Sequence, residues 1–174
     1  MRRRTAILLV SVAILAARDT GALAQNDCSA LRAPYLFLSP EGARQQRLGT
    51  TCSDKEIAKE QRTVACEELA EDVEHGGAEF RVADDQLLIL LEKDSNFFFE
   101  FFQGRSPLFD SWLRGIATSS FVAPYLYNNT TAMEERRRCL IELLKRAKVQ
   151  RTESESMRDR IIRRLTPIKV RVVD

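Results

Sequence analysis

The N-terminal leader constrains this chain more than any other feature of its sequence. Arg2, Arg3 and Arg4 precede an apolar run from Thr5 to Ala17, and small residues follow at Ala22-Leu23-Ala24. This order of charged, apolar and small-residue regions is typical of a secretory signal peptide. A transmembrane helix needs about 20 apolar residues, and this run is shorter. We therefore expect cleavage after Ala24, and a mature chain that is secreted or periplasmic and has no membrane span.

Removal of the leader would leave a chain of single-domain size. Proline and glycine are sparse, with 5 and 7 residues, and no internal repeat or linker is visible. A chain of this length buries about 70% of its unfolded surface, so it needs no cofactor for stability. We expect residues 1–24 to be cleaved and residues 25–174 to form one domain without a cofactor.

The cysteines that follow the leader indicate disulfide bonds. They are Cys28, Cys52, Cys66 and Cys139. An even number of cysteines in a short exported chain is typical of a disulfide framework. A zinc site is disfavoured because no Cys-x-x-Cys pair occurs and the chain has a single histidine. We expect two disulfides and no metal.

A helix expected after Cys52 limits the pairing. Ser53 and Glu56 form a capping box, which predicts a helix over 54–75. Cys66 would then lie about 21 Å along the helix from Cys52, at about 1.5 Å per residue. A disulfide requires Cα atoms within about 7 Å. This argument excludes a bond between Cys52 and Cys66.

Two pairings remain open after that exclusion. A bond between Cys28 and Cys139 would leave Cys52 and Cys66 to pair with each other, which is excluded. The remaining choices are 28–52 with 66–139, or 28–66 with 52–139. The first is favoured because Cys66 lies at the edge of its helix's apolar face. From there it could join that helix to the one expected around Cys139.

Hydrophobic periodicity predicts a mainly helical, disulfide-linked domain of about five helices. Besides 54–75, apolar residues recur at helical spacing over 85–103, 108–117, 132–149 and 153–165. The segment 85–103 forms either one helix or two, depending on whether Asp94-Ser95-Asn96 caps a second helix. Residues 27–49 show no such periodicity and are expected to be irregular.

Two further patterns concern the core and a small sheet. Five phenylalanines within 97–102 cannot share one face, so this segment is expected to be the most buried element. Short extended patterns occur at 35–38, 80–82 and 168–173. A single strand cannot satisfy its backbone, so the last of these predicts one small β-ribbon with either of the others.

The charge is divided along the chain. Residues 25–131 hold 10 basic and 17 acidic side chains, whereas residues 132–174 hold 13 and 7. These charges either complement each other inside the fold or leave a basic surface for an acidic partner. Arg160, Arg163 and Arg164 share one face of the last expected helix, and Arg136 to Arg138 open the helix before it. Nucleic acid is not expected, because no aromatic residue is interleaved with this basic region.

Candidates for catalysis are few. His75 is the only histidine and ends a helix, where the helix dipole favours it without any catalytic role. Five carboxylates on the same helix, at positions 67, 68, 71, 72 and 74, are typical of a solvated face. No nucleophile elbow, metal-binding His-Glu-x-x-His motif or phosphate-binding glycine loop is present.

Export, disulfides and the lack of catalytic motifs favour a non-enzymatic protein-interaction domain of the inhibitor, immunity or effector type. Two alternatives stay open. One is a small exported hydrolase that uses carboxylates with His75. The other is a binder of polyanions or membrane surfaces that uses the basic C-terminal region. Asn128 and Asn129 each begin an Asn-x-Thr sequon, which would be modified only in a eukaryotic secretory pathway.

Overall fold

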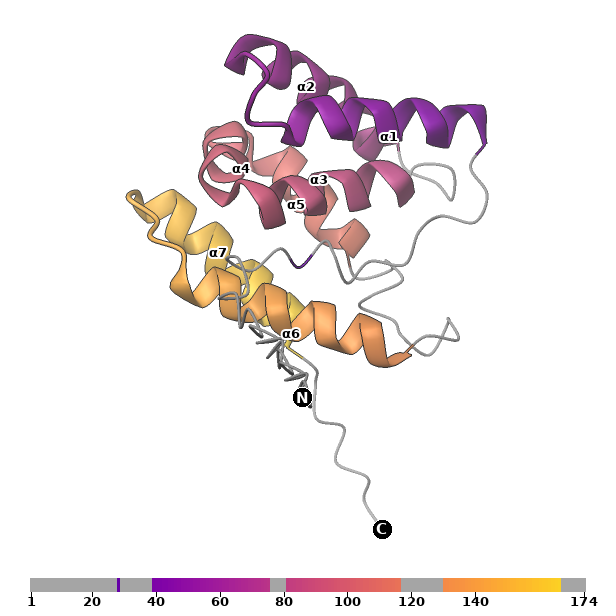
Figure 1. The fold of residues 1–174 in the computed structure, drawn as a ribbon. Helices are drawn as coiled ribbons and strands as arrows, with labels where there is room; N and C mark the ends of the chain where they lie inside the picture. Colours follow the sequence, from indigo (N-terminus) through magenta and orange to yellow (C-terminus); the bar gives the residue numbers. More distant parts are fainter. Residues whose placement is uncertain (1–27, 29–38, 76–80, 117–129, 167–174) are drawn as a thin grey trace, which may run out of the picture.

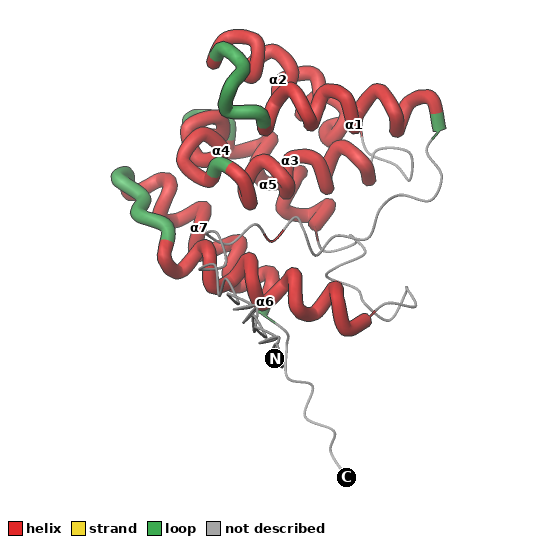
Figure 2. The backbone as a smooth tube through the Cα atoms, in the orientation of Figure 1, coloured by secondary structure: helices red, strands yellow, loops and turns green. Residues whose placement is uncertain are grey.

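The computed structural model describes residue 28 and residues 39–75, 81–116 and 130–166 (Figure 1). These residues are mainly helical and contain no strand (Figure 2). Their helices are α1 (Pro40–Ser53), α2 (Lys59–His75), α3 (Arg81–Lys93), α4 (Ser95–Phe102), α5 (Ser106–Ile116), α6 (Thr130–Arg146) and α7 (Thr152–Leu165). The described part thus has seven helices instead of about five.

Several expectations fall on segments outside the described residues. These are the leader, the extended patterns at 35–38 and 168–173, and the two sequons at Asn128 and Asn129. The extended pattern at 80–82 is wrong for Arg81 and Val82, because both belong to the first turn of α3. Among the described residues, no helix combines the length and apolar character that crossing a membrane requires.

Helix α1 occupies a stretch that its sequence predicts to be irregular. Ser39 caps it, and its Oγ accepts a hydrogen bond from the amide of Gly42 at 3.1 Å. Pro40 takes the first helical position, where a missing N–H group costs nothing. The prediction is wrong because Pro-Glu-Gly suits a turn and a first helical turn equally well.

The phenylalanine-rich segment divides into two helices at Asp94. The Asp94 side chain accepts a hydrogen bond from the amide of Phe97 at 3.2 Å and so caps α4. All five phenylalanines of α4 are buried, as expected. Phe98 lies 4.8 Å from Trp112 of α5, ring centre to ring centre, and the Trp112 indole donates a hydrogen bond to the Asp84 carbonyl of α3. The core therefore forms around α3, α4 and α5.

The disulfides join Cys28 to Cys139 and Cys52 to Cys66. The favoured pairing of 28–52 with 66–139 is therefore wrong, and so is its alternative. No helix begins at Ser53, because α1 ends there and α2 begins only at Lys59. The chain reverses between these helices, which lie side by side (Figure 1). This reversal brings the Cα atoms of Cys52 and Cys66 to 5.2 Å.

Arg62 fixes this reversal from inside the protein. Its Nε donates a hydrogen bond to the Cys52 carbonyl at 3.0 Å, and its Nη2 lies 2.9 Å from the Asp94 carboxylate. Its guanidinium also lies over the Phe97 ring, 4.0 Å from the ring centre. One buried side chain thus links the end of α1, helix α2 and the start of α4.

Helices α6 and α7 form a hairpin that lies below the α1–α5 body in Figure 1. Arg136 of α6 is 4% exposed and forms a two-pronged ion pair with Glu92 of α3, at 2.8 and 3.0 Å. Its third nitrogen lies 3.1 Å from Asp85. Burial by itself lowers the pKa of Arg136, but the charges and hydrogen bonds of Glu92 and Asp85 raise it above its ordinary value. Arg136 therefore stays charged and attaches the hairpin to the body.

Replacement of Arg136 tests this attachment. Arg136→Met is expected to lower the free energy of unfolding by about 3–5 kcal/mol, because Glu92 would stay buried without its main counter-ion. The double variant Arg136→Met/Glu92→Leu should lose clearly less stability than Arg136→Met, because it removes both charges. Urea unfolding measures each loss. Arg138→Met changes a side chain that is 71% exposed and serves as the control, with an expected change within about 1 kcal/mol. Equal losses for Arg136→Met and Arg138→Met would contradict the proposed attachment.

Gly49 marks a close approach of α1 and α3. A Cβ atom at this position would lie only 2.6 Å from Cβ of Gln86. Inside a helix, a glycine-to-alanine change normally stabilises by about 0.5–1 kcal/mol. Here we expect Gly49→Ala to destabilise by about 1–3 kcal/mol in thermal or urea unfolding, because the helices must separate. Gln46→Ala, at an exposed site of the same helix, should change the free energy of unfolding by less than about 0.5 kcal/mol.

The disulfide pairing is open to a direct test. Proteolysis of the oxidised, unreduced protein should yield one peptide that links Cys52 to Cys66 and another that links Cys28 to Cys139. Mass spectrometry before and after reduction identifies both. Removal of the Cys52–Cys66 disulfide in Cys52→Ala/Cys66→Ala should lower the free energy of unfolding by about 3 kcal/mol, as expected for a closed loop of about 15 residues. A peptide that joins Cys28 to Cys52 would contradict the fold of the α1–α2 pair.

Candidate anion-binding pocket

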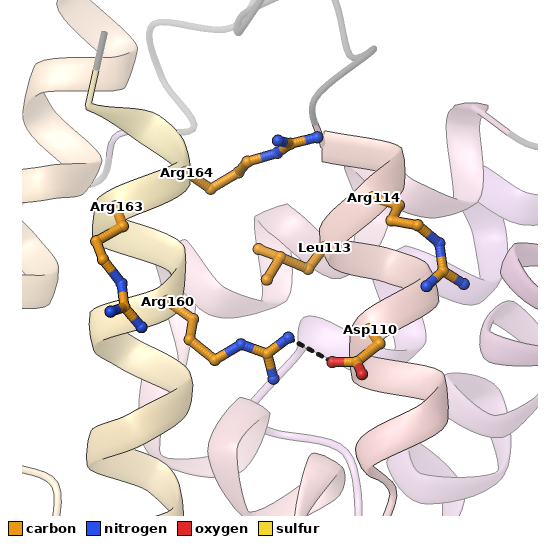
Figure 3. A pocket seen from close by; sticks show the side chains of 6 residues that line it. All are labelled: Asp110, Leu113, Arg114, Arg160, Arg163 and Arg164. Carbon is orange, nitrogen blue, oxygen red and sulfur yellow. Dashed lines mark hydrogen bonds and ion pairs between the residues drawn. The ribbon is translucent and has the colours of Figure 1, made fainter. Parts of the chain in front are cut away.

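A pocket of about 480 Å³ lies between α5 and α7 (Figure 3). Most of the side chains that line it are arginines. Among the described residues the lining consists of Asp110, Leu113, Arg114, Arg160, Arg163 and Arg164, and we call this set the arginine pocket. Figure 3 shows Arg160 and Arg164 reaching from α7 towards α5, with Leu113 between the two helices.

Helix α7 positions its three arginines through its apolar face. Met157, Ile161 and Leu165 are each at most 3% exposed and belong to the protein core. Because they fix the rotation of the helix, residues at other angular positions face outward. Arg160 is half-buried, whereas Arg163 and Arg164 are exposed. The core packing of α7 thus leaves its three arginines outside the core.

Arg160 is held in place by two contacts with α5. Its Nη2 lies 2.6 Å from Asp110 Oδ1, and its guanidinium lies 5.1 Å from the centre of the Phe109 ring. The side chains of Arg160 and Asp110 are 36% and 42% exposed. An ion pair at this exposure contributes only about 0.2–1 kcal/mol. A competing anion could therefore displace it.

The other arginines of the pocket differ from Arg160 in their contacts. Arg114 donates a hydrogen bond to the Ser111 hydroxyl at 2.8 Å. Within the described part of the chain, no carboxylate lies within ion-pair distance of Arg114, Arg163 or Arg164. Four arginines and one aspartate leave the lining with a charge of +3.

This lining suits binding rather than proton transfer. A guanidinium stays protonated at neutral pH, so it acts as neither acid nor base. Its planar array of N–H groups matches carboxylate and phosphate oxygens in pairs of hydrogen bonds. Leu113 is the only apolar side chain that the described residues contribute to the lining, so the lining favours an anionic ligand over an apolar one.

A second hollow, of about 410 Å³, lies between α4 and the 147–151 connection. Its lining mixes both charges with carboxamides, and Gln103 bridges it by hydrogen bonds to Ser154 and Arg151. Glu100 on its rim is paired with Lys59. Because these groups satisfy one another, this hollow indicates no particular ligand.

The sequence prediction and the pocket overlap in part. Arg160, Arg163 and Arg164, expected on one face of the last helix, come together in the arginine pocket. Asp110, Leu113 and Arg114 were not expected there. A possible signal was the spacing of Asp110 and Arg114 by four residues on α5, outside its buried positions. Nothing in the sequence connects that face to α7.

Two of the three arginines at 136–138 are buried and stabilise the fold. Arg136 is buried against Glu92 and Asp85. Arg137 is 7% exposed and donates hydrogen bonds to the Leu165 carbonyl at the end of α7 and to Glu134. The Arg137 hydrogen bond lowers the pKa of the Glu134 carboxyl. Of these three arginines only Arg138 is exposed, so internal complementarity explains most of this cluster.

Most of the catalytic candidates on α2 are exposed on the surface. His75 is exposed, and its Nδ1 lies 2.6 Å from the Glu71 carbonyl oxygen one turn earlier. Four of the five clustered carboxylates are exposed. The fifth, Asp72, is 9% exposed and lies 2.5 Å from Arg44. Burial raises the pKa of Asp72 above its usual value, although Arg44 opposes this shift.

Comparisons with known proteins add no identity. No protein-family model, curated protein or solved structure matches this chain. Within the described residues, no group of three or more histidine, cysteine, aspartate or glutamate side chains is arranged to hold a metal ion. The arginine pocket is therefore the basis for a functional proposal.

Proposed function

We propose that this protein is an exported, non-enzymatic interaction domain that binds an acidic segment of a partner protein through the arginine pocket. The observation that carries the proposal is the cluster of four arginines around a pocket with one acidic group. Arginine is the cation best suited to paired hydrogen bonds with carboxylates. The leader and the two disulfides are compatible with work outside the cytoplasm.

The distribution of charge favours this proposal over the binding of a polymer or membrane surface. A surface binder would draw on basic side chains over the whole region from Arg136 onward. Arg136 and Arg137 are buried and engaged with carboxylates, so they are absent from that surface. Arg163 and Arg164 remain exposed and line one pocket together with Arg160, which suits a short acidic segment better than an extended polyanion.

The hydrolase alternative has less support. It requires His75 and a carboxylate to converge on a substrate. The Nδ1 of His75 instead lies within hydrogen-bond distance of a backbone carbonyl of its own helix. Our proposal therefore assigns no catalytic residue.

A binding assay with a model acidic polypeptide tests the proposal. The oxidised chain should bind a fluorescent poly-glutamate peptide in an anisotropy titration. The affinity for this peptide should fall at least tenfold in Arg163→Gln/Arg164→Gln. The loss is expected because both exposed guanidinium groups of the pocket are removed from α7. Added salt should weaken binding as well.

A charge-matched control separates the pocket from net charge. Arg47→Gln/Arg146→Gln removes two exposed arginines from α1 and from the end of α6, away from the pocket. This control should change the affinity less than threefold. Equal weakening in both double variants, or no binding by the unaltered protein, would refute the proposed site.

A further inference from the structure

We infer that Asp110 is a built-in competitor for the arginine pocket, so that the pocket accepts a segment with two or more clustered carboxylates and rejects a single one. This inference rests on the proposed function and specifies the ligand of the same site. It assigns Asp110 the role of a specificity-determining residue.

The contact between α5 and α7 places Asp110 where a ligand carboxylate would bind. Its Oδ1 lies 2.6 Å from Nη2 of Arg160, and both side chains line the pocket (Figure 3). A carboxylate of the same protein needs no association step, so it competes at a high effective concentration. An incoming anion must therefore displace Asp110 or bind without Arg160.

The remaining arginines set the valency that a ligand needs. One exposed ion pair contributes about 0.2–1 kcal/mol, which is too little to offset the cost of association. A single carboxylate would therefore bind too weakly to measure. A segment that reaches Arg114, Arg163 and Arg164 together gains several such pairs after one association step. These residues stand on both walls of the pocket, so the ligand must present more than one charged group.

The pocket should keep its shape without the Asp110 charge. Arg160 also lies over the Phe109 ring, and Phe109 is fully buried in the core. In Asp110→Asn the amide oxygen can still accept the hydrogen bond from Arg160. The substitution thus removes one negative charge and leaves the position of the guanidinium largely unchanged.

The experiment compares two ligands and two charge-matched variants of the full oxidised chain. The ligands are a labelled peptide with four consecutive glutamates and the same peptide with three of them replaced by glutamine. Asp110→Asn should bind the four-glutamate peptide about three- to tenfold more tightly than the unaltered protein. Asp159→Asn removes the same charge from a 58% exposed site on α7 that does not line the pocket, and should change the affinity less than twofold.

The outcomes separate this inference from the proposed function. Unchanged or weaker binding by Asp110→Asn would overturn the inference, as would equal affinity of the unaltered protein for the two peptides. The proposed function would survive either result if binding still depended on Arg163 and Arg164. If neither peptide bound any variant, both proposals would fail. Asp110→Ser, checked by circular dichroism, provides a second charge-removing variant and should also tighten binding.

Competition with phosphate distinguishes a carboxylate site from a phosphate site. Inorganic phosphate and pyrophosphate, added at the same ionic strength, should displace the four-glutamate peptide only weakly if the site recognises a row of carboxylates. Displacement by either compound at lower concentration than by unlabelled peptide would overturn the assignment to clustered carboxylates and indicate a phosphate site instead.

Discussion

A buried ion pair between Arg136 and Glu92 connects the two parts of this fold. It attaches the α6–α7 hairpin to α3, and the hairpin in turn carries one wall of the arginine pocket. A buried pair contributes little net stability, but loss of one partner is costly. Its importance here is geometric, because it holds α6, the helix that packs on α7, against α3. The pocket is therefore a property of the assembled fold and not of α7 alone.

Arginine has two separate uses in this protein. Arg62 and Arg136 are buried, and each joins elements distant in sequence through fixed hydrogen bonds to backbone or carboxylate groups. Arg163 and Arg164 instead stand in water at the pocket. Buried guanidinium groups need full pairing, whereas exposed ones can exchange partners at small cost. Burial, not residue type, thus separates the arginines that build the fold from those proposed to bind a partner.

The helices and the core were largely predictable because their signals are local. The capping function of Asp94, the buried phenylalanines of α4 and the apolar face of α7 follow from spacing and side-chain chemistry. The prediction fails where one local pattern fits two structures. Ser39 and Pro40 start a helix that resembles a turn, and Ser53 ends a helix that it was expected to begin. That second error carried over into the cysteine pairing.

Residue type and short spacing in the sequence are enough to specify a mainly helical chain, two disulfides and the placing of three arginines on the outer side of α7. The packing of the helices in three dimensions sets the bond between Cys52 and Cys66, since that bond depends on a chain reversal between α1 and α2. That packing also decides that Asp110 faces Arg160 while Arg136 is buried. Such choices depend on packing between helices, which no local pattern records.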